Sequence, residues 1–470
     1  MIAVVFLTLL LGVTLAAAFF GGADPAASTA LAGQVLLLVG LFVAFFGVGL
    51  HVGAALGVLG LVVGLAYSDR PFWLFLGQTA WNPSSSFVLV AVPLFLLMGE
   101  VLLRAGLSEK LYRALDALIG RRVPGGLLHT NIAASGVFSA ISGSSVATAA
   151  TMGSVALPYF AREGAGYDRR AVLGSLAAGG ALGNLIPPGI TFIVYALITE
   201  TSVGALYLAA VVPSLLVVGL FTLVILARAR RIAPAWARAD DDAAPPRPPG
   251  EVRRALLDLV PTAALVLVVL GTIYGGLATP TESAALGVVG AVLFAALAGR
   301  LSWRLLDGAA EATARATAMV GLILLGAYVL NYVFTALGVP QALAALVSGL
   351  PVPPWAIMLL VVGFYLALGT FMEGFSMVVT TIPVVFPVVT ALGYDPIWFG
   401  VVVTMLVEIA LISPPDGTVL YVLQGMRSDE GPVTEVFSGV LPFLLVYILA
   451  VLALMAFPGL ALWLPSAVAG

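Results

Sequence analysis

Residues 166–195 have the sequence GYDRRAVLGSLAAGGALGNLIPPGITFIVY, and residues 393–421 repeat the pattern as GYDPIWFGVVVTMLVEIALISPPDGTVLY. In both stretches Gly-Tyr-Asp precedes an apolar run that Pro-Pro interrupts, and the copies are 227 residues apart. Proline removes a backbone donor and clashes with the preceding helical turn, so each Pro-Pro pair frees polar backbone groups inside an apolar helix. The sequence therefore predicts two broken helices at equivalent positions of an internal repeat.

Another apolar stretch, broken at its centre, precedes each copy, at residues 124–162 and 354–391. The first break has the sequence SGSS (142–145) and the second GTFMEGFS (369–376). Each arm of the first has about 16 residues, or about 24 Å of helix, which is short for a bilayer core of about 30 Å. Re-entrant hairpins are therefore favoured over pairs of full crossings.

The composition places the chain in a bilayer. Of its 470 residues 61% are hydrophobic and 9% are charged, whereas soluble domains carry about 25% charged residues. The apolar runs are long and do not alternate, which indicates helices rather than a β-barrel. The absence of cysteine excludes disulfides, thiolate catalysis and cysteine metal sites. The predicted fold class is an all-α polytopic membrane protein.

The apolar runs divide the chain into two halves. The expected limits are an extra helix and linker at 1–32, a first half at 33–227, a Pro- and Arg-rich loop at 228–254 and a second half at 255–470. Residues 1–20 lack the basic n-region of a secretion signal, so a retained helix is favoured over a cleaved signal, although Ala16-Ala17-Ala18 would suit cleavage. Short amphipathic helices are expected at 107–118 and 303–312. The expected spanning helices are 2–20, 33–49, 51–67, 86–104, 169–198, 204–227, 255–275, 282–299, 314–336, 396–425 and 433–456.

The basic residues test this layout. If each expected helix crosses once and each hairpin returns to its own side, 19 of the 20 Lys and Arg residues fall on one face, and Arg70 falls on the other. The positive-inside rule makes the basic face cytoplasmic, together with the loop 228–254. Five crossings then separate the hairpins, so they enter from opposite faces. This predicts an inverted repeat, a common build of secondary transporters.

The breaks are candidate binding sites. Unwound carbonyls can coordinate a small cation, and half-helix N-termini attract an anionic group. A plain kink would explain one Pro-Pro pair, and packing of small residues would explain isolated glycines. Two Pro-Pro pairs at equivalent positions, each beside a hydroxyl-rich hairpin tip, favour a binding site instead. Acidic residues in apolar segments are further functional candidates. The candidate substrate and ion ligands are Ser142, Gly143, Ser144, Ser145, Thr148, Asn184, Pro187, Pro188, Gly369, Thr370, Glu373, Glu408, Ser413, Pro414, Pro415 and Gly417.

Several of these motifs resemble one known family. The runs SGSSVATAATMGSVALP (142–158), LGNLIPPGITFIVY (182–195) and ATPTESAALG (278–287) are similar to the large membrane (M) subunit of TRAP transporters. So are GYDPIWFGVV (393–402) and ISPPDGTVLYV (412–422), and the resemblance covers roughly residues 34–465. It implies an inverted-repeat, elevator-type transporter of the ion-transporter superfamily in the bacterial inner membrane.

The resemblance also implies an activity and partners. The activity is Na⁺-coupled uptake of an organic acid that a periplasmic binding protein delivers, with Na⁺ as coupling ion and no other cofactor. The chain shows no fused four-helix segment, so the small four-helix membrane subunit is expected to be a separate chain. By resemblance, each hairpin tip and the neighbouring Pro-Pro break line one half of the site. The residues expected to hold Na⁺ are Ser144, Ser145, Gly369, Thr370 and Pro414.

Two other classes remain open. One is a stand-alone Na⁺/dicarboxylate or Na⁺/H⁺ transporter of the same fold, which needs no binding protein. The other is an intramembrane serine protease, because Gly136-Val137-Phe138-Ser139 loosely resembles a nucleophile turn. A Ser–His dyad of the rhomboid kind needs a downstream histidine, but His51 and His129 both lie upstream, and an HExxH motif is missing. We therefore expect a transporter rather than an enzyme.

Overall fold

The computed structural model describes residues 40–41, 44–45, 50–67, 74, 76–120, 123–162, 166–232, 250–349, 351–370, 372–427 and 431–469. The expected helix 2–20, most of the expected helix 33–49, Arg70 and residues 233–249 of the central loop lie outside the described residues. The regular structure of the described residues is helical, as predicted. The chain forms two compact units, Met1–Ser85 with Ala318–Leu343 and Ser86–Thr317 with Ala344–Gly470. The domain limits drawn from the sequence follow the repeat instead and stay a prediction.

The first unit contains α3 (Val52–Tyr67) and the second part of α14 (Trp303–Ala336). Glycines of α3 let the two backbones approach closely. A Cβ on Gly53 would lie 2.6 Å from the carbonyl carbon of Leu322, and one on Gly60 would lie 2.9 Å from Cα of Leu330. Small residues at such contacts are typical of helices that pack together in lipid.

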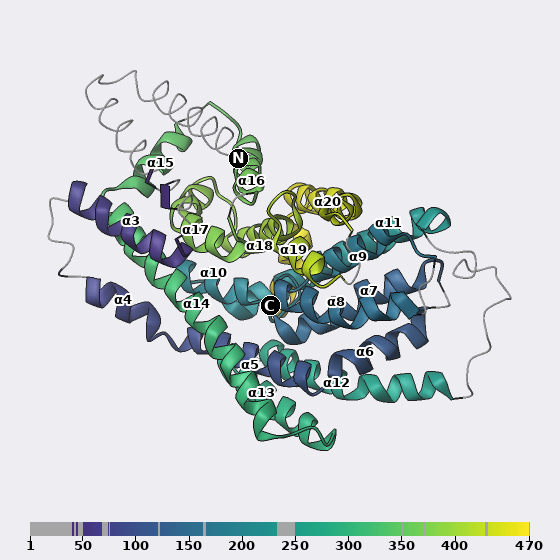
Figure 1. Ribbon diagram of the computed structural model, residues 1–470. Helices are drawn as coiled ribbons and strands as arrows, with labels where there is room; N and C mark the ends of the chain where they lie inside the picture. The colour runs from purple at the N-terminus through teal and green to yellow at the C-terminus, as the bar shows by residue number, and fades with distance from the viewer. Residues whose placement is uncertain are drawn as a thin grey trace. The chain divides into compact units, whose positions relative to one another are not determined.

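The second unit carries both hairpins and both broken helices (Figure 1). The hairpins are α7 (Gly126–Ser142) with α8 (Ser145–Arg162), and α16 (Pro354–Leu368) with α17 (Gly374–Ala391). The broken helices are α9 (Arg169–Gly180) with α10 (Ile190–Thr199), and α18 (Pro396–Ile412) with α19 (Thr418–Gly425). Both broken helices are interrupted at their Pro-Pro pairs, as the repeat predicts. The other helices of the chain are α4 (Leu76–Ser84), η2 (Phe87–Val90), α5 (Ala91–Arg104), α6 (Leu107–Leu115), the π-helical η3 (Asp116–Gly120), α11 (Val203–Ile232), α12 (Glu251–Tyr274), α13 (Pro280–Leu297), α15 (Val339–Ser348), α20 (Val433–Ala456) and α21 (Gly459–Ala469).

The two Gly-Tyr-Asp motifs start their helices in the same way. Asp168 and Asp395 each accept hydrogen bonds from two backbone N–H groups of the following first turn, at 2.7–3.3 Å. These bonds satisfy donors that have no partner within the helix. Gly166 and Gly393 have φ values of 98° and 87°, a conformation that favours glycine. The motif is therefore a helix-start signal that is used twice.

The two copies run in opposite directions, and α20 shows this directly. Gly439 in α20 packs against the Arg170 backbone at the start of α9. The Leu454 carbonyl, further along α20, accepts a 3.0 Å hydrogen bond from Trp398 Nε1 at the start of α18. At 1.5 Å per residue, about 22 Å of helix separates Gly439 from Leu454. The broken helices therefore begin at opposite ends of α20, which confirms the inverted repeat.

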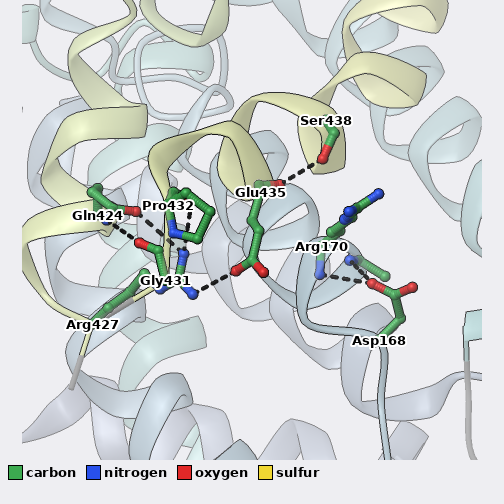
Figure 2. A network of polar contacts seen from close by, with 9 residues as sticks. Asp168, Arg170, Gln424, Arg427, Gly431, Pro432, Glu435 and Ser438 are labelled. Atoms are coloured by element: carbon green, nitrogen blue, oxygen red, sulfur yellow. Dashed lines mark hydrogen bonds and ion pairs between the residues drawn. The ribbon is translucent and has the colours of Figure 1, made fainter. Parts of the chain in front are cut away.

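The end at which α9 begins gathers basic residues. Between α19 and α20, Arg427 forms an ion pair with Glu435 (Nη2–Oε2 2.6 Å), and Asp168 and Arg170 lie beside it (Figure 2). The Asp168 N–H donates to the Ile232 carbonyl (3.0 Å), which places the basic end of α11 here as well. The charge layout predicts this grouping, whereas the assignment of this end to the cytoplasm stays a prediction.

The expected short helix at 303–312 is wrong as a separate element. Residues 303–336 form one helix, α14, because the join around 311–314 (EATA) contains no proline or glycine that would end it. Among the described residues, seven helical segments are long and apolar enough to cross a membrane. They are Phe87–Arg104, Val203–Ile232, Glu251–Tyr274, Pro280–Leu297, Trp303–Ala336, Gly374–Ala391 and Val433–Ala456.

A pair of glycine substitutions tests the contact between α9 and α20. A Cβ on Gly174 would lie 2.1 Å from the Gly439 carbonyl oxygen, whereas one on Gly219 in α11 would meet nothing within 4 Å. We expect Gly174→Ala to destabilise the protein by about 1–3 kcal/mol through overpacking. Gly219→Ala is expected to be neutral or stabilising by about 0.5–1 kcal/mol, since alanine favours helix. Thermal unfolding in detergent measures both, and equal midpoints for the two variants would contradict this contact.

Candidate functional site

The tip of the first hairpin is built against the first helix break. The N–H of Ile190, the first residue of α10, donates to the Gly143 carbonyl at the tip (3.1 Å). Gly143 has φ 60°, and a Cβ on it would lie 2.5 Å from the Pro188 carbonyl oxygen. On the other side, a Cβ on Gly183 would lie 2.3 Å from Cα of Ser145. The tip and the break therefore touch backbone to backbone, and only glycine permits both approaches.

A carboxylate from the other half of the chain joins this contact. Glu408, in α18, is fully buried, and its Oε1 and Oε2 lie 2.6 and 2.8 Å from the Ser145 hydroxyl oxygen. The Asn184 backbone N–H donates to Glu408 Oε1 (3.0 Å), and Asn184 Nδ2 donates to the Ser145 hydroxyl (2.9 Å). Three predicted site residues, 263 positions apart at most, thus form one buried cluster. The sequence indicated each of them, but not that they meet.

The other hydroxyls of the first tip have local partners. The side chains of Ser142 and Thr148 share a 2.7 Å hydrogen bond, and both residues are buried. Ser144 accepts a 3.4 Å bond from the Ala147 N–H at the start of α8, and its side chain is half-buried. Ser144 is therefore the hydroxyl that is most open to a ligand at this tip.

The second tip is organised around Glu373. Its Oε1 accepts from the Phe375 N–H (3.0 Å), and its Oε2 accepts from the Ser376 N–H (2.9 Å) and hydroxyl (3.0 Å). Glu373 is thus the N-cap of α17, where a negative charge complements the helix dipole. Thr370 donates to the Ala367 carbonyl (2.7 Å), so its hydroxyl oxygen still has acceptor capacity.

The second break keeps its polar groups close to solvent or to local partners. Ser413 ends α18 in an extended conformation, and its carbonyl accepts from the Gly417 N–H (3.0 Å). The Tyr421 hydroxyl donates to the Pro415 carbonyl (2.7 Å). Among the described residues no hydrogen bond joins Pro414, Pro415 or Gly417 to the first tip. Among the described residues, hydrogen bonds therefore join the first tip to its break and to Glu408, but they do not join it to the second break.

One turn of α18 contacts both tips. Glu408 faces the first tip, while a Cβ on Gly374 or on Gly369 of the second tip would lie 2.5 Å from Val407 Cγ1 or from Ala410 Cβ, respectively. Sequence analysis did not select Val407 or Ala410. The only available signal was the spacing of small residues in the tip, which also fits ordinary helix packing.

The fold and site define a class of protein. The chain is a polytopic membrane transporter in which an inverted repeat supplies two hairpin tips and two helix breaks. The family model "Tripartite ATP-independent periplasmic transporter, DctM component" matches residues 39–460. The chain therefore belongs to this family, the large permeases that support substrate uptake as part of a tripartite (TRAP) transporter.

Known relatives agree with the family. The C4-dicarboxylate TRAP large permease of Pseudomonas aeruginosa is 34% identical over 82% of this chain and 88% of its own length. The sialic acid TRAP large permease of Vibrio cholerae is 32% identical over 83% of this chain and 89% of its own. The solved YdaH transporter of Alcanivorax borkumensis has a TM-score of 0.60 at 19% identity, over 90% of this chain and 98% of that one, and it supports the fold alone.

Two left-handed glycines provide a test of the contact between tip and break. Gly143 (φ 60°) and Gly276 (φ 64°) have nearly the same conformation, but a Cβ on Gly276 would meet nothing within 4 Å. Alanine incurs a similar backbone cost of about 1–2 kcal/mol at both positions. Only Gly143→Ala adds a clash of about 1–3 kcal/mol, so its uptake rate is expected to fall by about tenfold or more relative to Gly276→Ala. The measurement is substrate uptake at matched membrane levels, and similar rates would refute the close approach.

Proposed function

We propose that this chain couples uptake of an organic acid to Na⁺ entry across a bacterial inner membrane. A periplasmic binding protein delivers the acid, and a small four-helix membrane subunit completes the transporter. The Arg-rich end of the second unit and the loop 228–254 face the cytoplasm, as the positive-inside rule favours. The hairpins and broken helices form a block that carries the substrate across the membrane in an elevator-type movement.

The charge around the site carries the proposal. Residues 140–148, 183–189, 369–376 and 407–417, which form the tips, the breaks and the turn of α18, contain no Lys or Arg but do contain Glu373, Glu408 and Asp416. Because these segments supply no positive side chain, an organic anion has no counter-charge there unless cations bind with it. Hydroxyl and unwound carbonyl oxygens are the ligands by which broken transporter helices hold Na⁺. Bound Na⁺ therefore supplies the missing positive charge, which makes uptake dependent on Na⁺.

The residues proposed to contact Na⁺ are those of the tips and the second break. Ser144 and Thr370 have hydroxyl oxygens with free acceptor capacity, and Gly369 and Pro414 offer backbone carbonyls. Ser145 is the fifth candidate, although its hydroxyl already contacts Glu408. The anionic group of the substrate would bind between the tips, near the N-termini of α10 and α19.

The names of relatives support an acidic substrate. Relatives are named for C4-dicarboxylate, sialic acid and 2,3-diketo-L-gulonate, all of which are organic acids. A relative in Oleidesulfovibrio alaskensis is named an isethionate permease protein DctMQ, and this chain covers 64% of it at 31% identity. The relatives are named as permeases, which argues against the intramembrane protease. Which acid this chain carries is set by its binding protein in our proposal.

Reconstitution tests the coupling. The permease and its small subunit, placed in proteoliposomes with the binding protein outside, are expected to accumulate the acid only under an inward Na⁺ gradient. Replacing Na⁺ by K⁺ should lower the uptake rate by about tenfold or more, because the site then lacks its counter-charge. Uptake without the binding protein would instead identify a stand-alone transporter of the same fold. Equal uptake in Na⁺ and K⁺ would refute the coupling.

A serine pair tests the ligand assignment at the first tip. Ser144 and Ser202 each accept one N–H bond at the start of a helix, at 3.4 and 3.3 Å, but Ser202 precedes α11 and belongs to neither tip. Loss of either cap costs about 1 kcal/mol. We therefore expect Ser144→Ala to raise the Na⁺ concentration for half-maximal uptake severalfold, while Ser202→Ala leaves it unchanged. Glu373→Gln should also lower Na⁺-dependent uptake, and all variants should reach the membrane at wild-type levels.

A further inference from the structure

Glu408 is sealed inside the second unit. Its exposed fraction is 0%, and among the described residues no Lys or Arg forms an ion pair with it. A buried carboxylate is costly unless hydrogen bonds replace its hydration. An apolar side chain at this position would favour stability, so a functional reason for the carboxylate is to be found in its hydrogen bonds.

The donors to Glu408 all come from the first half of the chain. The Ser145 hydroxyl and the Asn184 N–H donate to the carboxylate, and Asn184 Nδ2 donates to Ser145 in turn. Ser145 begins α8 at the hairpin tip, and Asn184 lies in the break between α9 and α10. The carboxylate thus ties the tip to the break. Both of its oxygens face these partners, and no part of its side chain is exposed.

In the part of the chain that the structure describes, the first copy of the repeat has no counterpart of the Glu408 contact, so the repeated backbone alone does not require it. The position equivalent to Glu408 in the first copy, 227 residues earlier, is Ala181. The alanine side chain has no polar group that could bond to a tip, and the Ala181 carbonyl accepts a 3.3 Å hydrogen bond from the Tyr447 hydroxyl. The second tip has its own carboxylate, Glu373, which acts within the tip. Among the described residues, the hydrogen bonds of the first tip include one to a side chain of the opposite half, and those of Glu373 in the second tip stay within that tip.

We infer that Glu408 is a positioning residue that braces the first hairpin tip through Ser145 and Asn184 and does not itself bind substrate or Na⁺. The inference rests on the proposed function, since the tip that it braces is one half of the proposed site. It also links the two half-sites, because Val407 and Ala410 in the same turn of α18 contact the second tip. Loss of the carboxylate frees the first tip and leaves the second tip in place.

Thiol labelling tests the brace without any transport. The natural sequence has no cysteine, so one introduced cysteine is a unique reporter. Val146→Cys reports on the first tip, where the valine is 37% exposed, and Thr370→Cys reports on the second. In the permease with its small subunit, without Na⁺, substrate or binding protein, Glu408→Ala is expected to raise the maleimide labelling rate of Val146→Cys about fivefold or more. The rate at Thr370→Cys should stay unchanged.

Matched variants separate a brace from a general loss of packing. Ser145→Ala removes the same contact and should raise labelling of Val146→Cys as Glu408→Ala does, and the double variant should add nothing further. Glu408→Gln keeps the shape and should give a smaller increase. Thr404→Ala, one turn earlier in α18, removes a buried hydroxyl that donates to the Gly400 carbonyl within the same helix, and it should leave labelling unchanged.

Two results would overturn the brace. One is unchanged labelling of Val146→Cys in both Glu408→Ala and Ser145→Ala. The other is a Glu408→Gln variant with wild-type labelling but no Na⁺-dependent uptake, which would give Glu408 a direct role in ion binding. Because labelling needs no Na⁺, failure of Na⁺ coupling in the wild-type protein would refute the proposed function and leave the labelling result interpretable.

Discussion

Every backbone polar group inside a membrane protein needs a partner, and the two Pro-Pro breaks remove partners at mid-helix. The chain answers this need at the first break by bringing a hairpin tip against it, so that the Ile190 N–H finds the Gly143 carbonyl. The approach requires glycine at Gly143 and Gly183, since a Cβ at either would collide with backbone. The unpaired backbone groups at the first break therefore account for both the polar site and its close packing. The hydroxyl-rich tip lies against the break because these groups need hydrogen-bond partners.

The two half-sites meet this demand with different chemistry. The first tip has no charged side chain and carries the hydroxyls of Ser142, Ser144 and Thr148. The carboxylate that contacts it, Glu408, belongs to α18. The second tip contains Glu373, which caps the start of α17 from within. The two copies of the repeat thus share a backbone arrangement, but the polar groups at their tips differ. Such inequality is what the proposed function needs, because two identical sites would not distinguish an anion from cations.

The sequence predicted the repeat, both broken helices and both hairpins, because proline pairs, Gly-Tyr-Asp and hydroxyl runs are local signals with local physical causes. It also selected Ser145, Asn184 and Glu408 separately. It could not predict that they meet, since the contact joins residues 263 positions apart and depends on how α18 crosses the first hairpin. The role of Gly183 was hidden for a similar reason: a glycine in an apolar helix fits plain packing equally well. The continuous α14 was missed because the amphipathic pattern at 303–312 suggested a short interfacial helix, whereas the segment continues into the following helix without a break.

The two tips contact α18 through different kinds of interaction. Glu408 contacts the first tip through hydrogen bonds, which tolerate little displacement, whereas the contacts that Val407 and Ala410 make with the glycines of the second tip are van der Waals contacts. A van der Waals contact can slide or open at small cost, but separation of a buried carboxylate from its donors leaves it without compensation. The first tip is therefore held to α18 more firmly than the second tip.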